Sequence, residues 1–199
     1  MPLSTDEVID TAAELLRRHG LADLSMRRLA SELGVRPGAL YWHVENKQTL
    51  LVRVADRVLA DVPTTTSGAP ARDIRRLLTA IRTAVLPVPD GGEVVALGYA
   101  LDPTSVQVFV HLRRLIGDLG VAGRDRAAAT DLIVHHVLGS IAAQQDRQLA
   151  GLPTRGASAA FDRGVALVLD RLGRPTETTE TAGATESTET TDRRQEEAT

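Results

Sequence analysis

The segment 24–47 constrains the fold of this chain more than any other part of the sequence. It predicts a helix capped by Ser25, a turn at Gly34 and a further short helix that begins near Pro37. Serine caps helix starts with its hydroxyl group, glycine tolerates the positive φ of a helix end, and proline fits a first helical turn. Two short helices joined by a glycine turn are how a helix-turn-helix motif presents side chains to the DNA major groove. The segment therefore predicts a DNA-binding domain.

The run LYWHVENK, which begins at Leu40, supplies aromatic and polar side chains to this segment. It contains the only tryptophan, the only lysine and one of the two tyrosines of the chain. Val35, Leu40 and Val44 predict an apolar face that holds the helix in place, which leaves the small and polar residues between them for DNA. Trp42 is expected to be half-buried. An alternative stays open, in which Tyr41 and Trp42 are core aromatics of a small helical domain.

Helical periodicity continues on both sides of this segment and through the rest of the chain. Ser4 and Glu7 have the spacing of a capping box, at the start of a first helix that ends before Gly20. Asn46 is placed to cap a fourth helix, which Pro63 ends. Since no run alternates apolar and polar residues with a period of two, the sequence predicts an all-α fold. Further helices are expected near 71–85, 91–100, 103–118, 123–149 and 158–172.

Composition divides the chain into three parts. A turn-rich stretch at 64–70 separates a helix-turn-helix domain with its connecting helix, 1–62, from a second helical domain, 71–173. From 174 to 199, threonine and glutamate dominate, so a disordered acidic tail is expected. This tail holds seven acids and three arginines, a charge of −4 within the net −3, which leaves +1 for the rest. DNA contact must therefore come from a local patch rather than from overall charge.

Several function classes lack the residues that they need. The chain has no cysteine for disulfides or zinc, and no apolar run long enough for a signal peptide or a membrane span, so a cytoplasmic protein is expected. His135 and His136 project about 100° apart on a helix and do not share one metal ion. With His111, they are expected to be surface or interface residues. No motif places a catalytic set or a phosphate loop, so neither an enzyme, a catalytic residue, a metal nor a cofactor is expected.

From about Thr5 to Arg57 the chain resembles the N-terminal domain of the tetracycline-repressor (TetR) family of bacterial regulators. The residues that carry the resemblance are LSMRRLASELGV over 24–35 and LYWHVENKQTLL over 40–51, and they are most similar to the tetracycline repressors themselves. The resemblance implies an all-helical homodimer. Its N-terminal helices would bind a palindromic operator, and its C-terminal domain would bind a small inducer that changes the separation of the two DNA-reading heads.

Carried over by position, the resemblance implies a set of DNA-contacting residues: Met26, Arg27, Pro37, Gly38, Ala39, Tyr41, Trp42, His43 and Lys47. The third helix departs from the family at its start, where Pro37, Gly38 and Ala39 replace polar or bulkier residues. Arg27 and Arg36 are therefore expected to decide specificity, because a guanidinium fork suits guanine O6 and N7. Lys47, in the first turn of the fourth helix, is placed to contact a phosphate.

The resemblance is weaker toward Leu172, and it breaks down in the ligand pocket. Positions that ligate the drug or its magnesium in the tetracycline repressors hold apolar residues here: Pro63, Leu78, Ala96, Ala100 and Leu112. We therefore expect an organic, more apolar and metal-free inducer. Arg82 is the expected anchor for an anionic or carbonyl group, with an ordinary surface arginine as the alternative. The residues expected to line the pocket are Leu78, Arg82, Tyr99, Phe109, Leu112, Thr130 and Val134.

The last two helices predict a dimer interface. The first of them carries small residues on one side, which permits close approach of a partner helix, and the second is amphipathic. Two such helices from each subunit suit an isologous four-helix interface, and an intrachain bundle is the alternative. The residues expected at the interface are Gly139, Ala142, Ala143, Phe161, Val165 and Leu169.

These expectations describe a ligand-responsive transcriptional repressor that binds palindromic operator DNA as a homodimer and is released by a small organic inducer. The alternative is a helical binding or scaffold module that has lost specific DNA recognition. Arg27, Tyr41, His43 and Lys47 discriminate between the two, because a relative that no longer reads DNA has no need to keep them. All four are present, which favours the repressor.

Overall fold

The computed structural model describes residues 3–173, and the regular structure of this range is entirely helical, which confirms the all-α prediction. The elements are α1 Thr5–His19, α2 Met26–Glu32, α3 Pro37–Leu40, α4 Lys47–Val58, α5 Pro70–Val85, α6 Gly91–Leu101, α7 Gln107–Asp118, α8 Arg126–Leu149 and α9 Ala157–Leu172. Within this range, none of the helices combines the length and apolar character that a membrane span requires. The acidic tail expected at 174–199 lies outside the described residues.

Side-chain caps set the helix starts near the N-terminus at the predicted positions. Oxygens of Ser4, Ser25 and Asn46 each accept a bond from the amide three residues later, at 3.1, 3.2 and 2.8 Å. Each bond satisfies an amide that a helix start leaves free. The chain leaves α1 and α2 through Gly20 and Gly34, whose φ angles of 76° and 67° suit glycine. Local chemistry therefore delimits the helices of the helix-turn-helix segment.

The start of α7 differs from the prediction. The helix expected from 103 begins at Gln107, because Asp102 holds the preceding residues in a turn. The Asp102 carboxylate accepts hydrogen bonds from the hydroxyl group of Ser105, from the hydroxyl group of Thr104 at 2.7 Å and from the amide of Thr104 at 3.0 Å. These bonds lower the pKa of Asp102 to about 2. Side-chain bonds of this kind compete with helical backbone bonding, so the turn displaces the first residues of the expected helix.

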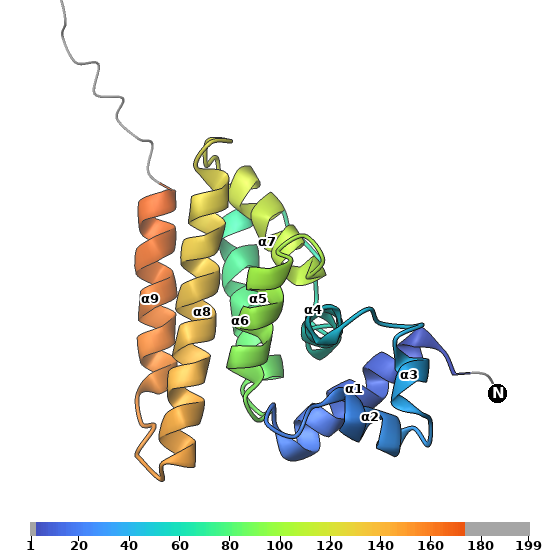
Figure 1. Cartoon of the computed structure of the whole chain (residues 1–199). Coiled ribbons are helices and arrows are strands. Elements are labelled where there is room, and N and C mark those ends of the chain that lie inside the picture. Colours follow the sequence, from blue (N-terminus) through green and yellow to red (C-terminus); the bar gives the residue numbers. More distant parts are fainter. Residues whose placement is uncertain (1–2, 174–199) are drawn as a thin grey trace, which may run out of the picture.

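The helices form two groups joined by α4. Figure 1 shows α1, α2 and α3 at one end of the molecule and α5 to α9 at the other, with α4 between them and α8 beside α9. One continuous cluster of buried apolar side chains runs from Leu16 in α1 through Leu51 in α4 to Ile141 in α8 and Leu169 in α9. Removal of this apolar surface from water is the main stabilising contribution, and it holds both groups together.

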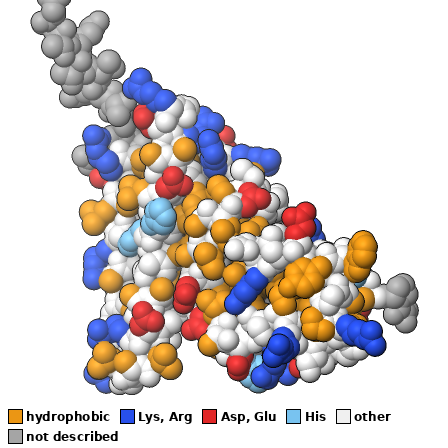
Figure 2. All heavy atoms as spheres, viewed as in Figure 1, with side chains coloured by type: hydrophobic (Ala, Val, Ile, Leu, Met, Phe, Trp, Pro, Cys, Tyr) orange, Lys and Arg blue, Asp and Glu red, His pale blue; other side chains and the backbone are white. Residues whose placement is uncertain are grey.

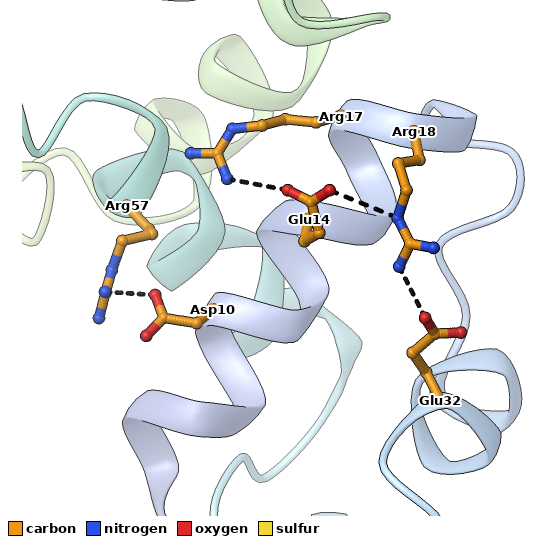
Figure 3. Close-up of polar contacts among 6 residues, drawn as sticks. All are labelled: Asp10, Glu14, Arg17, Arg18, Glu32 and Arg57. Atoms are coloured by element: carbon orange, nitrogen blue, oxygen red, sulfur yellow. Dashed lines mark hydrogen bonds and ion pairs between the residues drawn. The ribbon is translucent and has the colours of Figure 1, made fainter.

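Ion pairs on the outside of α1 connect it to α2 and α4 (Figure 3). Arg18 of α1 places Nη2 2.6 Å from Glu32 Oε1 of α2, and Arg57 of α4 pairs with Asp10 of α1. The hydrogen bond from Arg18 lowers the pKa of the Glu32 carboxyl group. Such exposed pairs contribute little to stability. The apolar core beneath them therefore sets the relative positions of these helices.

Candidate DNA-binding surface and ligand-binding region

The position of α3, a single helical turn, depends on the apolar residues around it. Leu40 and Val44 are 0% and 2% exposed, and Val35 is partly buried against the same core. The amides of His43 and Val44 both donate to the Leu40 carbonyl oxygen at 2.9 Å, so the chain stays tightly wound after the helix ends. The predicted apolar face is present: it joins the buried apolar cluster of the protein, and α3 packs against α2.

The residues predicted to contact DNA lie on this anchored segment and its neighbours, α2 and the start of α4. The exposed ones are Arg27, Arg36, Pro37, Gly38, Tyr41, Trp42 and Lys47, and the partly buried ones are Met26, Ala39 and His43. Figure 2 shows hydrophobic side chains gathered at this end of the molecule beside Lys and Arg side chains. A surface that combines cations with aromatic and small groups has the chemistry to meet both phosphates and base edges.

Trp42 does not take the half-buried position expected of it. Because α3 ends at Leu40, Tyr41 and Trp42 lie in the following turn, and their side chains are 53% and 90% exposed. Leu40 and Val44, on either side of this stretch, are the buried apolar residues here. The alternative in which both aromatics belong to the core is therefore wrong. Large apolar side chains left in water mark an interaction surface.

Two polar residues of the surface have defined local surroundings. His43 Nδ1 lies 3.2 Å from the Thr5 hydroxyl oxygen, which orients the imidazole ring against the first turn of α1. Lys47 is the first residue of α4 and directly follows the Asn46 cap. Free amides and the positive end of the helix dipole favour an anion there, so the Lys47 ammonium group adds to an environment suited to phosphate.

Arg28, which the sequence did not single out, lies beside Arg27 on the exposed side of α2. It lines a surface hollow of about 380 Å³ together with Arg27, Ser25 and Ser31. Its position beside Arg27 in the first turn of α2 is visible in the sequence. The Arg28 amide donates a hydrogen bond to the Ser25 side chain, which caps this helix. The turn presents two adjacent guanidinium groups, and both belong to the same exposed patch.

The connecting helix α4 crosses α6 tightly at Gly98. A Cβ atom placed on Gly98 would lie 2.4 Å from the Ala55 Cβ, so only glycine permits this approach. The amide of Gln107, at the start of α7, donates to Asp56 Oδ1 of α4 at 2.9 Å. The connecting helix α4 therefore contacts both α6 and the start of α7.

The loop between α5 and α6 makes a second link to the N-terminal helices. Asp90 has a φ of 56°, a left-handed conformation that aspartate adopts more readily than most residues, and its Oδ2 accepts the Leu21 amide at 2.8 Å. Gln145 of α8 holds the same loop: its Nε2 donates to the Val88 carbonyl oxygen at 2.6 Å, and its Oε1 accepts the Gly92 amide at 3.1 Å. The loop is thereby held between α8 and the end of α1.

The residues predicted to line a ligand pocket are all buried: Leu78, Arg82, Tyr99, Phe109, Leu112, Thr130 and Val134. Tyr99 and Phe109 meet edge to face with their ring centroids 5.0 Å apart, and the Tyr99 hydroxyl donates to Asp131 Oδ1 at 2.5 Å. Burial and this bond raise the pKa of Tyr99. Arg82, by contrast, lines a cavity between α5 and α9. The alternative of an ordinary surface arginine is wrong for Arg82, which is 8% exposed.

The apolar residues expected at the positions of drug and magnesium ligands differ in burial, so they do not line one common interior space. Leu78 and Leu112 are buried, whereas Pro63 and Ala100 are exposed and Ala96 is partly exposed. Within residues 3–173, no three His, Cys, Asp or Glu side chains are grouped so that they could hold a metal ion.

Comparison with known proteins relates this architecture to a family of regulators. Residues 8–54 match the model of the bacterial regulatory proteins of the tetR family. The chain is 33% identical to tetracycline repressor protein class D of Escherichia coli over 152 residues, 74% of this chain and 69% of that repressor. The chain belongs to the tetR family. This family consists of DNA-binding transcriptional regulators rather than enzymes.

Solved structures of tetR-family proteins share the fold. BioQ with its natural double-stranded DNA operator has a TM-score of 0.75 at 36% identity, over 86% of this chain and 99% of BioQ. A TetR variant of Acinetobacter baumannii AYE in complex with minocycline has a TM-score of 0.73 at 29% identity, over 87% of this chain and 100% of that one. The helices α1–α4 correspond to the DNA-binding end of the tetR-family fold, and α5–α9 to its C-terminal helical domain.

The residues predicted for a tetR-family dimer interface fall into two groups. Phe161, Val165 and Leu169 are 2%, 5% and 4% exposed, because they pack into the core of the chain next to α8. Ala142 is partly buried, and a Cβ atom on Gly92 of α6 would lie 2.9 Å from its amide nitrogen. These four residues take part in packing within the chain.

The second group faces solvent. Gly139 and Ala143 are exposed, and a Cβ atom added to Gly139 would meet nothing within 4 Å. Leu132, one heptad before Gly139 on α8, is 55% exposed, and Leu167 of α9 is 73% exposed. These two helices therefore leave apolar and small residues uncovered on the surface of the chain.

The histidines of α7 and α8 have separate surroundings. The His136 ring stacks on Phe161 at a centroid distance of 6.0 Å, whereas His135 is exposed and His111 is partly buried. Adjacent positions on α8 direct His135 and His136 to different neighbours, as the sequence predicts.

Proposed function

We propose that this protein is a ligand-responsive transcriptional repressor that binds palindromic operator DNA as a homodimer and is released by a small organic inducer. The observation that carries the proposal is the exposed set of cationic and aromatic side chains on α2, α3 and the start of α4, above the buried Leu40 and Val44. Arg27 and Arg36 have the geometry to read guanine, and Lys47 stands at a helix start that suits phosphate. The solved operator complex of BioQ supports this reading of the fold.

Gel retardation of DNA from the protein's own promoter region, at low salt, tests DNA binding. Wild type should retard it. An Arg27→Ala Lys47→Ala double variant should bind more weakly, by about 1–3 kcal/mol for each interaction with a base that it no longer makes. The salt dependence of its binding should fall by about one for each phosphate that it no longer touches. Arg75→Ala, on an exposed position of α5, is the matched control and should bind like wild type. No retardation by folded wild type would favour the scaffold alternative.

Dimerisation is proposed through the exposed sides of α8 and α9. One short recognition helix reads too few base pairs to find a site by itself, so a second copy is needed. Gly139 and Ala143 would permit close approach, and Leu132 and Leu167 would be covered. Light scattering should show a dimer for wild type and a monomer for Leu132→Glu. Leu101→Glu, exposed on α6, should keep the wild-type mass. A monomeric wild type, or a footprint over one half-site, would contradict the dimer.

Release by an inducer requires that the C-terminal helices move the DNA-contact surface. The tight crossing of Gly98 over Ala55 supports this step, because a shift of α6 displaces α4. An apolar organic compound should raise the unfolding temperature in a screen that contains a chelator, and it should then release operator DNA. Stabilisation only in the presence of Mg²⁺ would overturn the metal-free inducer.

The proposal also assigns DNA binding to residues 1–62 and ligand binding with dimerisation to 71–173. Limited proteolysis should cut first between them, since residues 63–68 are all exposed. A first cut inside α5 or α6 would contradict this division.

A further inference from the structure

Arg82 is a buried cation with an incomplete set of partners. It is 8% exposed, its Nη2 donates to Gln144 Oε1, and its guanidinium carbon lies 5.1 Å from the Phe161 ring centroid. Its Nη1 has no hydrogen-bond partner among the described residues. Of the ion pairs within residues 3–173, none includes Arg82. A guanidinium group carries five N–H donors, and burying its charge without an anion is unfavourable.

The same arginine lines a cavity of about 340 Å³ between α5 and α9. Leu86 and Phe161 give the cavity apolar walls, and Thr79 and Thr83 bring hydroxyl groups to it. This volume lies at the lower end of the range for small-molecule sites, which are mostly apolar with a few polar groups that fix orientation. A buried, unsatisfied cation at the wall of such a cavity is the arrangement that a bound anion completes.

A second cavity, of about 750 Å³, adjoins the first, because Thr79 and Thr83 line both. Ala80 and Ala84 of α5 form part of its wall, and Val58 of α4 forms another part. A ligand anchored at Arg82 can therefore extend along α5 and reach the helix that joins the DNA-contact surface to the rest of the molecule.

We propose that Arg82 is the anion subsite of the inducer, and that the inducer is a monocarboxylate whose apolar body lies along α5 toward α4. This inference rests on the proposed function. A carboxylate matches the guanidinium fork with two parallel charge-assisted hydrogen bonds. Among the residues lining the Arg82 cavity, Arg82 is the only cation and Asp162 adds a negative charge, so a dianion such as a phosphate monoester is disfavoured. A neutral ligand would leave the guanidinium charge uncompensated.

Calorimetric titration of the full-length protein, without DNA and with a chelator, tests this assignment. The probes are butanoate, hexanoate, octanoate and phenylacetate, each paired with its primary amide. Wild type should bind the carboxylates at least about tenfold more tightly than the amides, with affinity rising from butanoate to octanoate. Arg82→Met keeps an unbranched, mostly apolar side chain without the guanidinium group and its charge. It should weaken carboxylate binding about 10- to 100-fold while leaving amide binding unchanged. Arg75→Met, the same substitution at an exposed position of α5, should bind like wild type.

Thermal unfolding of the variants separates a loss of binding from a loss of folding. Arg82→Met should unfold at or above the wild-type temperature, because it removes an uncompensated buried charge. If Arg82→Met does not fold, Arg82→Lys replaces it in the titrations, because lysine keeps the charge without the forked geometry of the guanidinium group. This variant should bind the carboxylates more weakly than wild type does. It should still bind each carboxylate more tightly than the matching amide.

Three results would overturn the inference: equal binding of carboxylates and amides by wild type, full carboxylate affinity in folded Arg82→Met, or no binding of any carboxylate to folded wild type. Promoter retardation by wild type is measured in parallel. If DNA binds while carboxylates fail, the inference falls and the repressor proposal stands. If no DNA binds, the repressor proposal falls whatever the titrations give.

Discussion

The DNA-contact surface and the Arg82 region place their charged groups in opposite environments. Arg27, Arg36 and Lys47, which are proposed to contact DNA, are exposed, so their charges stay hydrated in the free protein. Arg82 is buried, with one hydrogen bond to α8 and one aromatic neighbour from α9. Water stabilises a solvated charge, so its side chain requires only a well-anchored backbone. A buried charge has lost that hydration and requires polar or charged partners, which here come from several helices. The first region therefore depends on its local anchors, and the second on how distant helices pack.

Leu40→Ala should have the largest effect, because it removes the anchor beneath the DNA-contact surface. Leu40 is fully buried, and truncating such a side chain destabilises a protein by about 2–5 kcal/mol. Urea unfolding measures the loss. Tyr41→Ala, at the neighbouring exposed position, should change stability by less than about 0.5 kcal/mol while lowering DNA affinity. Similar losses of stability in both variants would remove the distinction between anchor and surface.

Gly98→Ala tests the crossing that joins the two regions. The added Cβ atom would meet the Ala55 Cβ at 2.4 Å, so α4 and α6 must separate, at a cost of about 1–3 kcal/mol. Urea unfolding and operator affinity should both report the change, because α4 carries the start of the DNA-contact surface. Ala100→Ser, exposed on the same helix, is the control. Unchanged DNA affinity in a destabilised Gly98→Ala variant would show that the crossing does not couple the regions.

Asp90→Ala should have a smaller effect, of about 1 kcal/mol, because it removes the bond to the Leu21 amide. Hydrogen exchange of the Leu21 amide should accelerate, and urea unfolding should report the stability. Asp90→Asn keeps an acceptor oxygen and tolerates the left-handed backbone, so it should stay close to wild type. If the asparagine variant loses as much as the alanine variant, the bond to Leu21 is not the source of the effect.

The smallest effect should come from the pH dependence of the Asp102 turn. The hydroxyl groups of Ser105 and Thr104 lower the pKa of Asp102 from 3.8 to about 2. Because the pKa of Asp102 is lower in the folded state than in the unfolded state, its charged carboxylate stabilises the folded protein at pH values above 3.8. This contribution is lost as the pH falls from about 3.8 toward about 2. The unfolding temperature of wild type should fall more steeply over this range than that of Asp102→Asn. Parallel curves would contradict a role for the charged turn.

The helix caps show how far local sequence carries a structural prediction. Ser25, Gly34 and Asn46 act through bonds within a few residues, and each has its predicted role. The predicted start of α7 is wrong, because hydrogen bonds to the Asp102 side chain hold the preceding residues in a turn and compete with helical backbone hydrogen bonds. Trp42 is exposed while Leu40 and Val44 are buried, and the residue type of Trp42 by itself does not predict that difference.

The all-α class, the helix-turn-helix segment and the family resemblance could all be predicted from the sequence, since they depend on the spacing of caps, turns and apolar residues along short stretches. The burial of Arg82 with an unsatisfied nitrogen, and the place of Phe161, Val165 and Leu169 in the core of the chain, became visible in the three-dimensional fold. The reason is that burial is set by neighbours far apart in the chain. Arg82 meets Gln144 across 62 residues, a distance over which no local pattern specifies contact.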